Sequence, residues 1–157
     1  MRVGIGYDSH RFDPARPLVL GGITIPGSAG LIGHSDADAV CHALTDAILG
    51  AAAMGDIGRH FPDTDPKWAG ANSVVLLVSA HDIVKHAGWH LNQADVTVIA
   101  QSPKLSPHVD AMRTRLAAAL EVGVGAISIK AKTNEGMGFI GRGEGIAVMA
   151  VATLVAV

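Results

Sequence analysis

The chain has 157 residues, 49% of them hydrophobic but only 4% aromatic, so Ala, Val, Ile and Leu must build the core of what we expect to be one domain over residues 1–157. The formal net charge of −2 gives no electrostatic reason to expect a nucleic acid or an anionic membrane surface as partner. The single cysteine, Cys41, excludes an intrachain disulfide and favours a reducing compartment.

The N-terminus lacks the basic segment and following apolar segment of a signal peptide. The longest apolar run, residues 146–157, is too short to span a bilayer. We therefore expect a soluble cytoplasmic protein that has neither a membrane nor a nucleic acid as partner.

Strands and helices alternate along the chain. The pattern predicts, in chain order, a strand at 2–9, a hairpin at 17–27, a helix at 34–56, a loop at 58–70, a helix at 72–88, a strand at 93–101, a helix at 106–122, a strand at 126–133, a loop at 134–145 and a strand at 146–157. This order predicts an α/β fold of the α+β type, with helices on one face of a mixed sheet. The last strand is apolar on both faces, which predicts that neighbouring subunits help to cover it.

The predicted helix at 34–56 has a recognisable start and an apolar stripe. Ser35 followed by Asp38 fits a capping box. The stripe comprises Val40, Leu44, Ala47, Ile48 and Ala51. On the opposite face lies His42, with Asp38 and Asp46 one turn away on either side.

Asp8 and His10 lie two residues apart in the first predicted strand. Their side chains point to the same face, on the order of 6–7 Å apart along the strand. That spacing suits two ligands of one metal ion, and it equally suits a solvated strand edge. With His42 they would supply one carboxylate and two imidazoles, the ligand number of a catalytic zinc ion with an open fourth position. Asp38 or Asp46 could then accept a hydrogen bond from the other ring nitrogen of His42, unless this helix face is simply solvated.

Two further segments suit phosphate groups. His34 and Ser35 stand at the predicted helix start, where free backbone N–H groups attract anions, although His34 could equally be an ordinary loop residue. Near the C-terminus a strand end and a glycine-rich loop combine cationic, hydroxyl and amide side chains, which suit a polyphosphate, and Glu135 could hold a second divalent ion. These side chains are Lys130, Lys132, Thr133, Asn134, Glu135 and Arg142. Three other histidines, His81, His86 and His90, are expected at the surface.

Six segments, taken together, resemble one known family. They are GYDSHRF, LGGITIP, GHSDADAVCHALTDAILGAAAMGDIG, FPDTDP, AQSPKLSPH and KAKTNEGMGFIGRGEGIA, and the resemblance runs from Met1 to Val157. The family is that of the 2-C-methyl-D-erythritol 2,4-cyclodiphosphate synthases, zinc-dependent lyases of non-mevalonate isoprenoid biosynthesis. The resemblance implies conversion of 4-diphosphocytidyl-2-C-methyl-D-erythritol 2-phosphate into the cyclic 2,4-diphosphate and CMP. It also implies a homotrimer whose active sites are shared between adjacent subunits.

The resemblance implies a role for each matching residue. One zinc ion per subunit would be bound by Asp8, His10 and His42. The transition state would be stabilised by His34 and Thr133, and Asp8, His10 and His34 would also contact the substrate. The phosphorylated methylerythritol would contact Ser35, Asp56, Ile57, Gly58, Phe61, Pro62, Asp63, Thr64 and Asp65. The cytosine pocket would comprise Ala100, Gln101, Ser102, Pro103, Lys104, Leu105 and Ser106. The cytidine diphosphate would contact Lys132, Thr133, Asn134 and Glu135, with Glu135 reaching a magnesium or manganese ion. Residues at the trimer axis, where isoprenoid diphosphates have been proposed to bind, are matched by Phe139, Arg142 and Glu144.

Lys132 departs from the family pattern, because a small hydroxyl residue is often found at its position. Ser102 and Ser106 lie in a variable part of the cytosine pocket, so these departures concern the nucleotide side of the site. Two other functions use the same residues. One is a zinc-dependent phosphodiesterase that yields linear products, and the other is a non-catalytic trimer that binds isoprenoid diphosphates. An intact set of metal ligands argues against a purely binding role.

Overall fold

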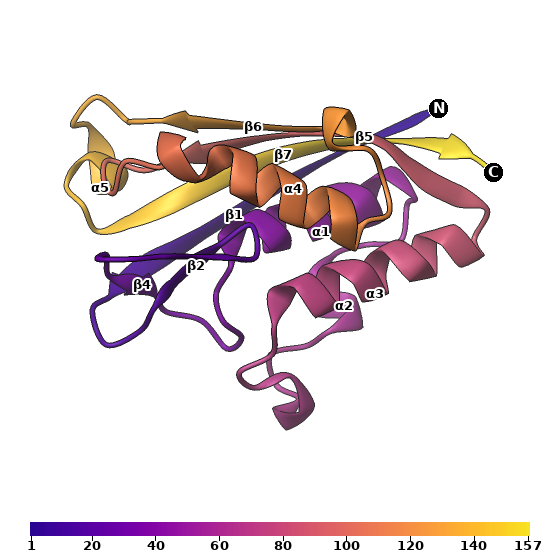
Figure 1. Cartoon of the computed structure of the whole chain (residues 1–157). Helices are drawn as coiled ribbons and strands as arrows, with labels where there is room; N and C mark the ends of the chain where they lie inside the picture. Colours follow the sequence, from indigo (N-terminus) through magenta and orange to yellow (C-terminus); the bar gives the residue numbers. More distant parts are fainter.

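The structure, a computed structural model, describes residues 1–157 and is built around one five-stranded sheet (Figure 1). Its strands are β1 (Arg2–Asp13), β4 (Gly30–Leu31), β5 (Trp89–Ile99), β6 (Ile127–Lys132) and β7 (Gly145–Ala156), in the order β4-β1-β7-β5-β6. The pair β5–β6 is parallel and the other pairs are antiparallel, so the predicted mixed sheet is confirmed. The predicted hairpin is also present, as the separate ribbon of β2 (Leu18–Leu20) and β3 (Ile23–Ile25).

Three long helices lie on one face of the sheet, as predicted (Figure 1). They are α1 (Ala39–Ala51), α3 (Ser73–His86) and α4 (Val109–Ala119). The two segments predicted as loops contain the short helices α2 (Ile57–His60) and α5 (Gly138–Gly141), and 3₁₀ turns span Pro66–Trp68, Ser106–His108 and Val124–Ala126. No helix has both the length and the apolar character needed to cross a membrane.

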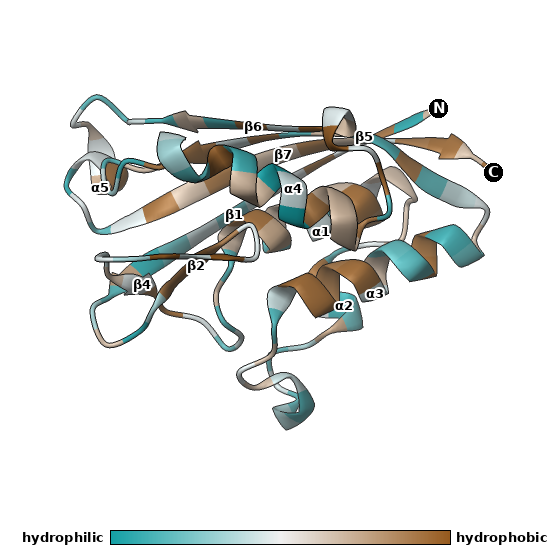
Figure 2. Cartoon of the chain, viewed as in Figure 1, coloured by the Kyte–Doolittle hydropathy of each residue, from teal (hydrophilic) through white to brown (hydrophobic).

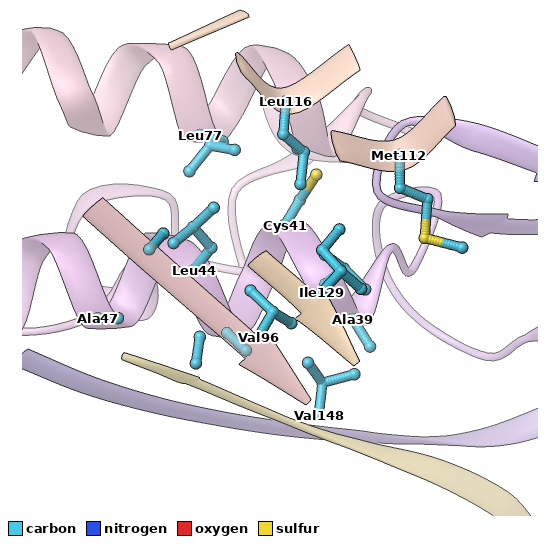
Figure 3. Close-up of a cluster of buried hydrophobic side chains, with 14 of the residues drawn as sticks. Ala39, Cys41, Leu44, Ala47, Leu77, Val96, Met112, Leu116, Ile129 and Val148 are labelled. Carbon is cyan, nitrogen blue, oxygen red and sulfur yellow. The ribbon is translucent and has the colours of Figure 1, made fainter. Parts of the chain in front are cut away.

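Helix α1 is the centre of the core because most of its residues are buried, the predicted apolar stripe included. Figure 2 shows hydrophobic residues along α1 and β7, whereas the C-terminal half of α3 is hydrophilic. Figure 3 shows Cys41 and Leu44 of α1 among aliphatic side chains from the sheet and from the outer helices. These neighbours are Leu77, Val96, Met112, Leu116, Ile129 and Val148.

Strand β1 lies directly against the backbone of α1. A Cβ atom on Gly4 would overlap the Ala47 carbonyl oxygen, and one on Gly6 would overlap the Ala43 carbonyl oxygen. Both glycines are on the face of β1 that also carries Asp8 and His10, because side chains alternate along a strand. The two glycines therefore let the strand approach the helix to backbone distance.

The start of α1 differs from the prediction. The helix begins at Ala39, and its N-cap is Asp38, whose Oδ1 accepts a hydrogen bond from the Cys41 N–H at 3.1 Å. The same buried carboxylate accepts from the N–H groups of Gly21 and Gly22, at 2.9 and 2.7 Å. Burial raises the pKa of Asp38, and the three backbone donors lower it in part. The capping box expected from Ser35 is therefore wrong, and Asp38 instead ties the β2–β3 ribbon to α1.

The other face of the sheet lacks cover from this chain. Alternate residues of β7 are buried under the helices, but Met149 and Val151 on the opposite face are 42% and 40% exposed. Val3, Ile5 and Tyr7 of β1 continue this apolar face, with exposures of 64%, 66% and 56%. The chain thus covers one face of the last strand and leaves the other bare.

His81 was expected at the surface, but it is buried, whereas His86 and His90 are exposed as predicted. Its Nε2 accepts a hydrogen bond from the Leu91 N–H at 3.4 Å, which binds α3 to the start of β5. Burial lowers the pKa of His81, and the positive charge of Lys85 adds to the effect.

The contact between β1 and α1 predicts a large cost for Gly6→Ala. The added methyl group must push the helix backbone away, so the free energy of unfolding should fall by about 1–3 kcal/mol or more. Gly123→Ala is the matched control: Gly123 has φ −65° and nothing near its Cβ position, so a change within about 0.5 kcal/mol is expected. Urea unfolding at fixed protein concentration measures both, and equal costs would contradict this view of the contact.

The lowered pKa of His81 predicts that the free energy of unfolding falls in acid. Its pKa is lower in the folded than in the unfolded chain, so below about pH 6.5 the unfolded chain binds the extra proton and the free energy of unfolding falls. Above that pH the contribution is fully present. His81→Gln removes the titrating group, so its stability should fall less between pH 7 and pH 5 than that of the parent, whereas His86→Gln should follow the parent curve. Parallel curves for all three proteins would rule out His81 as the cause.

Candidate metal centre and its pocket

Three potential metal ligands converge where β1 passes the first turn of α1. The Asp8 Oδ2 atom lies 2.8 Å from His10 Nε2 and 3.1 Å from His42 Nδ1, and the two ring nitrogens are 3.3 Å apart. Asp8, His10 and His42 can each offer one ligand atom within 4.8 Å of the others. The expectation that these three residues meet is confirmed, and the group could hold one divalent metal ion.

Both rings are held by their second nitrogen. His10 Nδ1 lies 2.6 Å from the Ile32 carbonyl oxygen, so it is the donor, and Nε2 is left without a proton in the neutral ring. His42 Nε2 lies 2.8 Å from Ser73 Oγ and 3.1 Å from Ser35 Oγ, which leaves Nδ1 facing Asp8. Rings oriented in this way are typical of histidines that bind a metal. The residues present therefore fit a metal ion.

The cluster is electrostatically coupled. Burial alone would raise the pKa of Asp8, but the hydrogen bonds and positive charge that His10 and His42 supply when their Asp8-facing nitrogens carry a proton outweigh it and lower this pKa below the usual value. For His10, burial opposes the proton, yet the hydrogen bond and charge of Asp8 raise its pKa. A carboxylate that stays ionised is a competent metal ligand, and protons compete with the metal for the imidazoles as the pH falls.

A cavity of about 400 Å³ opens beside the cluster. It unites residues predicted for the metal, the phosphate and the methylerythritol, together with four that were not predicted. The predicted ones are His10, His34, Ser35, His42, Ile57, Gly58, Phe61, Pro62 and Asp63, and the others at this wall include Ile32, Trp68 and Leu76. The rings of Phe61 and Trp68 meet edge to face, 5.1 Å apart, and form an apolar wall.

His34 and Ser35 lie at this cavity, but not at a free helix N-terminus. The helix starts four residues after Ser35, and its N-terminus is already occupied by the buried carboxylate of Asp38. The prediction that the helix end forms a phosphate seat is therefore wrong. His34 is exposed, and its Nε2 lies 3.3 Å from the Asp65 carbonyl oxygen, so an anion here would meet side chains instead of helix N–H groups.

The acids beside His42 in the sequence have other partners. Asp38 binds backbone N–H groups, and Asp46 Oδ1 accepts from the Ile57 N–H at 2.7 Å. Burial raises the pKa of Asp46, and that backbone bond lowers it in part. The prediction that Asp38 or Asp46 accepts from His42 is wrong, because Ser73 occupies that place. Asp46 instead anchors the segment that carries Ile57 to the cavity wall.

The loop acids serve as local caps. Asp56 Oδ1 accepts from the Arg59 N–H at 2.9 Å and caps α2, and Asp65 Oδ1 accepts from the Lys67 N–H at 2.9 Å. Neither these acids nor Thr64 is among the residues lining the cavity. Their geometry fixes the loop that presents Phe61, Pro62 and Asp63.

The predicted nucleotide residues form a second cavity, of about 350 Å³. It is lined by Ala100, Gln101, Pro103, Lys104, Leu105, Ser106, Ala131, Lys132 and Thr133. Ser102 instead faces a neighbouring cavity that it shares with Pro103 and Gly143. Thr133 Oγ1 lies 3.2 Å from Glu135 Oε1, and Asn134 Nδ2 donates to the Met137 carbonyl oxygen at 2.8 Å. The cavity beside the metal cluster and the nucleotide cavity share no lining residue, so one chain does not bring His34 and Thr133 together.

Arg142 and Lys130 are engaged in ion pairs. Arg142 Nε donates to Glu144 Oε2 at 2.9 Å, and Lys130 Nζ pairs with Asp95 Oδ2 at 2.5 Å. Phe139 lies with Glu144 in a small cavity of about 190 Å³ that also touches His10. Lys130 is therefore engaged by Asp95, whereas exposed Lys132 is available for the predicted contact with a polyphosphate.

Sequence reasoning missed Asp36 and Ser73, which stand behind His42. Ser73 was recognised only as part of a predicted helix. Its position at the first residue of α3, after the Asn72 cap, is a sequence signal for a hydroxyl held at a fixed place, but not for its partner. That partner becomes visible only when the loop before α1 meets the start of α3.

A family model described as the YgbB family matches residues 1–155. A protein named 2-C-methyl-D-erythritol 2,4-cyclodiphosphate synthase from Burkholderia mallei (strain SAVP1) is 54% identical over 154 residues, covering 98% of this chain and 95% of that protein. A solved cyclodiphosphate synthase structure, described as the bound form with CDP, superposes with a TM-score of 0.90 at 42% identity and covers 98% of this chain and 100% of its own. The bifunctional IspDF from Campylobacter jejuni gives a TM-score of 0.96 at 47% identity, and the match covers 99% of this chain but 42% of that one.

The cluster predicts that His42→Ala abolishes tight binding of a divalent metal. Removing one of three ligands and the ring that closes the cluster should leave at most weak binding, while far-ultraviolet circular dichroism stays as in the parent. His86→Ala is the control, because His86 is exposed and its Nδ1 lies 2.7 Å from a carbonyl oxygen of its own helix. Metal content after dialysis, measured by mass spectrometry, decides the matter: stoichiometric metal in the His42→Ala protein would contradict the assignment.

Proposed function

The chain belongs to the YgbB family, that of the 2-C-methyl-D-erythritol 2,4-cyclodiphosphate synthases, and we propose that it forms the cyclic diphosphate and CMP from 4-diphosphocytidyl-2-C-methyl-D-erythritol 2-phosphate. It is an enzyme of this family, which serves isoprenoid biosynthesis. The observation that carries the proposed reaction is the position of Asp8, His10 and His42 at the edge of the cavity that also holds His34 and Ser35.

We assign one zinc ion to the cluster. Two imidazoles and one carboxylate with an open fourth position are the ligand set of catalytic zinc sites. When bound, such an ion withdraws charge from a phosphoryl oxygen as a Lewis acid. His10 and His42 would each bind it through one ring nitrogen. The other ring nitrogen is held by the Ile32 carbonyl oxygen in His10 and by Ser73 Oγ in His42.

The proposed reaction joins two groups of one substrate. An oxygen of the 2-phosphate attacks the β-phosphorus of the diphosphate, a P–O bond forms, and the bond to CMP breaks so that CMP leaves with the electron pair. The 2-phosphate and the diphosphate are both anions and repel each other. The protein must therefore supply hydrogen-bond donors that offset this repulsion, and it need not supply a nucleophile. His34 would donate a hydrogen bond to the phosphoryl oxygens on one side, and Thr133 on the other. Holding both ends of the substrate is worth up to about 7–11 kcal/mol in favourable cases.

The walls of the cavity favour cyclisation over hydrolysis. Phe61 and Trp68 form an apolar edge beside His34 and Ser35, and the Phe61–Asp65 segment would enclose the methylerythritol chain. Exclusion of water from the reacting phosphorus leaves the 2-phosphate as the available nucleophile. This is the feature that separates a cyclase from the alternative phosphodiesterase.

The second cavity would take the cytidine. The backbone N–H and C=O groups of segment 100–106 would form hydrogen bonds with the edge of the cytosine base. Lys132 would place a positive charge beside the diphosphate. The Glu135 carboxylate, which is exposed and lies near the Thr133 hydroxyl, would hold a magnesium or manganese ion, which would offset the negative charge of the diphosphate. CDP is the ligand of one solved relative.

We propose a homotrimer with shared active sites. Two observations support it: the predicted site residues of one chain divide between two cavities, and the outer face of β1 and β7 is apolar and bare. Burying that face between subunits would bring the cytidine cavity of one chain to the metal cavity of the next. Phe139 and Arg142 would then lie near the axis, where an isoprenoid diphosphate could bind once Arg142 exchanges its Glu144 partner.

Phosphorus NMR of the protein with substrate, zinc and magnesium tests the reaction. We expect a cyclic diphosphate with one CMP for each product molecule. His34→Ala should lower kcat by about 10²–10³-fold, because one donor to the transition state is lost. Thr114→Ala should leave the rate unchanged, because Thr114 is an exposed residue of α4 whose hydroxyl bonds the Asp110 carbonyl oxygen of its own helix.

Other products would overturn the proposal in distinct ways. CMP together with a linear bisphosphate would identify a phosphodiesterase. Absence of turnover, with about one zinc ion per chain, would identify a binding protein.

A further inference from the structure

A hydrogen-bond chain extends from the metal cluster through His42. The Nε2 atom of His42 lies 2.8 Å from Ser73 Oγ, and Ser73 Oγ also bonds Asp36 Oδ1. Ser73 is the fully buried first residue of α3, and Asp36 lies in the loop before α1. Neither residue belongs to the ligand set or to the cavity lining.

The chemistry of Asp36 determines which atom donates and which accepts in each of these hydrogen bonds. Its carboxylate also accepts from the Ser73 N–H and from the Asp38 N–H, each at 3.2 Å. A carboxylate has only acceptors, so the Ser73 hydroxyl must donate its single proton to Asp36. The remaining lone pairs of Ser73 Oγ can only accept, and the donor that meets them at 2.8 Å is the N–H of His42 Nε2.

The hydrogen bonds of Ser35 are consistent with the same assignment of donors and acceptors. Its Oγ accepts from the Ala37 N–H at 3.1 Å and lies 3.2 Å from Ser73 Oγ, to which it can give its proton. Ser35 therefore does not compete for the Asp36 carboxylate. Every member of this buried network has a partner, and the protons all point from His42 and Ser35 towards Ser73 and from Ser73 to Asp36.

We propose that Asp36 and Ser73 are positioning residues that hold the His42 ring with its Nε2–H on Ser73 and its Nδ1 free to bind a metal ion together with Asp8 and His10. This proposal rests on the metal site of the proposed function. A ring held at Nε2 cannot turn without losing its hydrogen bond, and an acceptor at Nε2 increases the basicity of Nδ1 as a ligand. Asp36 and Ser73 thus affect metal binding only through the orientation and basicity of His42.

Two variants of the full chain test the proposal by different chemistry. Ser73→Ala removes the acceptor and leaves a smaller side chain. Asp36→Asn keeps the shape, but its NH₂ group, a donor, replaces one of the two carboxylate oxygens that accept from the hydroxyl and from the N–H of Ser73. Ser79→Ala is the matched control, because Ser79 is on the same helix and its hydroxyl bonds only the Val75 carbonyl oxygen, at 2.8 Å.

Two readouts are taken without turnover. Zinc affinity, by competition with a chelator, should fall by about 10–100-fold in Ser73→Ala and Asp36→Asn and stay as in the parent in Ser79→Ala. In ¹H–¹⁵N spectra of the zinc-loaded parent, the His42 Nε2–H proton should be protected from exchange with water. In the two variants that protection should be lost, an effect that general destabilisation of the fold would not confine to one ring.

The outcomes separate this proposal from the function it rests on. Parent-like zinc affinity and a protected His42 proton in both variants would overturn the roles of Asp36 and Ser73. If Ser73→Ala does not fold, Asp36→Asn decides. A parent that binds no zinc overturns the metal site and this proposal together, whereas a parent that binds zinc but does not cyclise overturns only the reaction.

Discussion

The backbone contact between β1 and α1 is the constraint on which the site depends. Gly4 and Gly6 let the strand approach the helix without intervening side chains, and Asp8 follows on the same face of the strand. The helix turn that meets Gly6 contains Ala43, next to His42. Any side chain at Gly6 would move the strand ligands away from the helix ligand, so tight core packing sets the geometry of the metal centre.

Three acids, of which Asp38 is buried and Asp36 and Asp46 are half-buried, organise the loops around that contact. Asp38, Asp36 and Asp46 each accept hydrogen bonds from backbone N–H groups. Asp36 also accepts one from the Ser73 hydroxyl. Carboxylates this near to an anionic substrate would repel it if they faced the cavity. Because donors within the protein occupy them, they hold the cavity walls in place, and Asp8 is the acid of the metal cluster.

Local patterns predicted much of this arrangement. Alternation in β1 placed Asp8 and His10 on one face, and helical periodicity separated His42 from the buried stripe, so these patterns allowed a candidate metal cluster, which the family resemblance favoured over a solvated surface. The polar partners did not, because they depend on contacts between segments far apart in the chain. Asp38 looked like a neighbour of His42 but meets the β2–β3 ribbon, and Ser73 reaches His42 only after α3 docks. His81 looked like a surface residue because its cover comes from β5.

Anomalous diffraction from crystals grown with zinc, recorded on both sides of the zinc absorption edge, tests the central claim most directly. The account predicts one peak per chain, at about 2.0–2.2 Å from Asp8 Oδ2, His10 Nε2 and His42 Nδ1, with a fourth position open towards His34. A peak elsewhere, no peak at this cluster, or an ion bound through His42 Nε2 would contradict it.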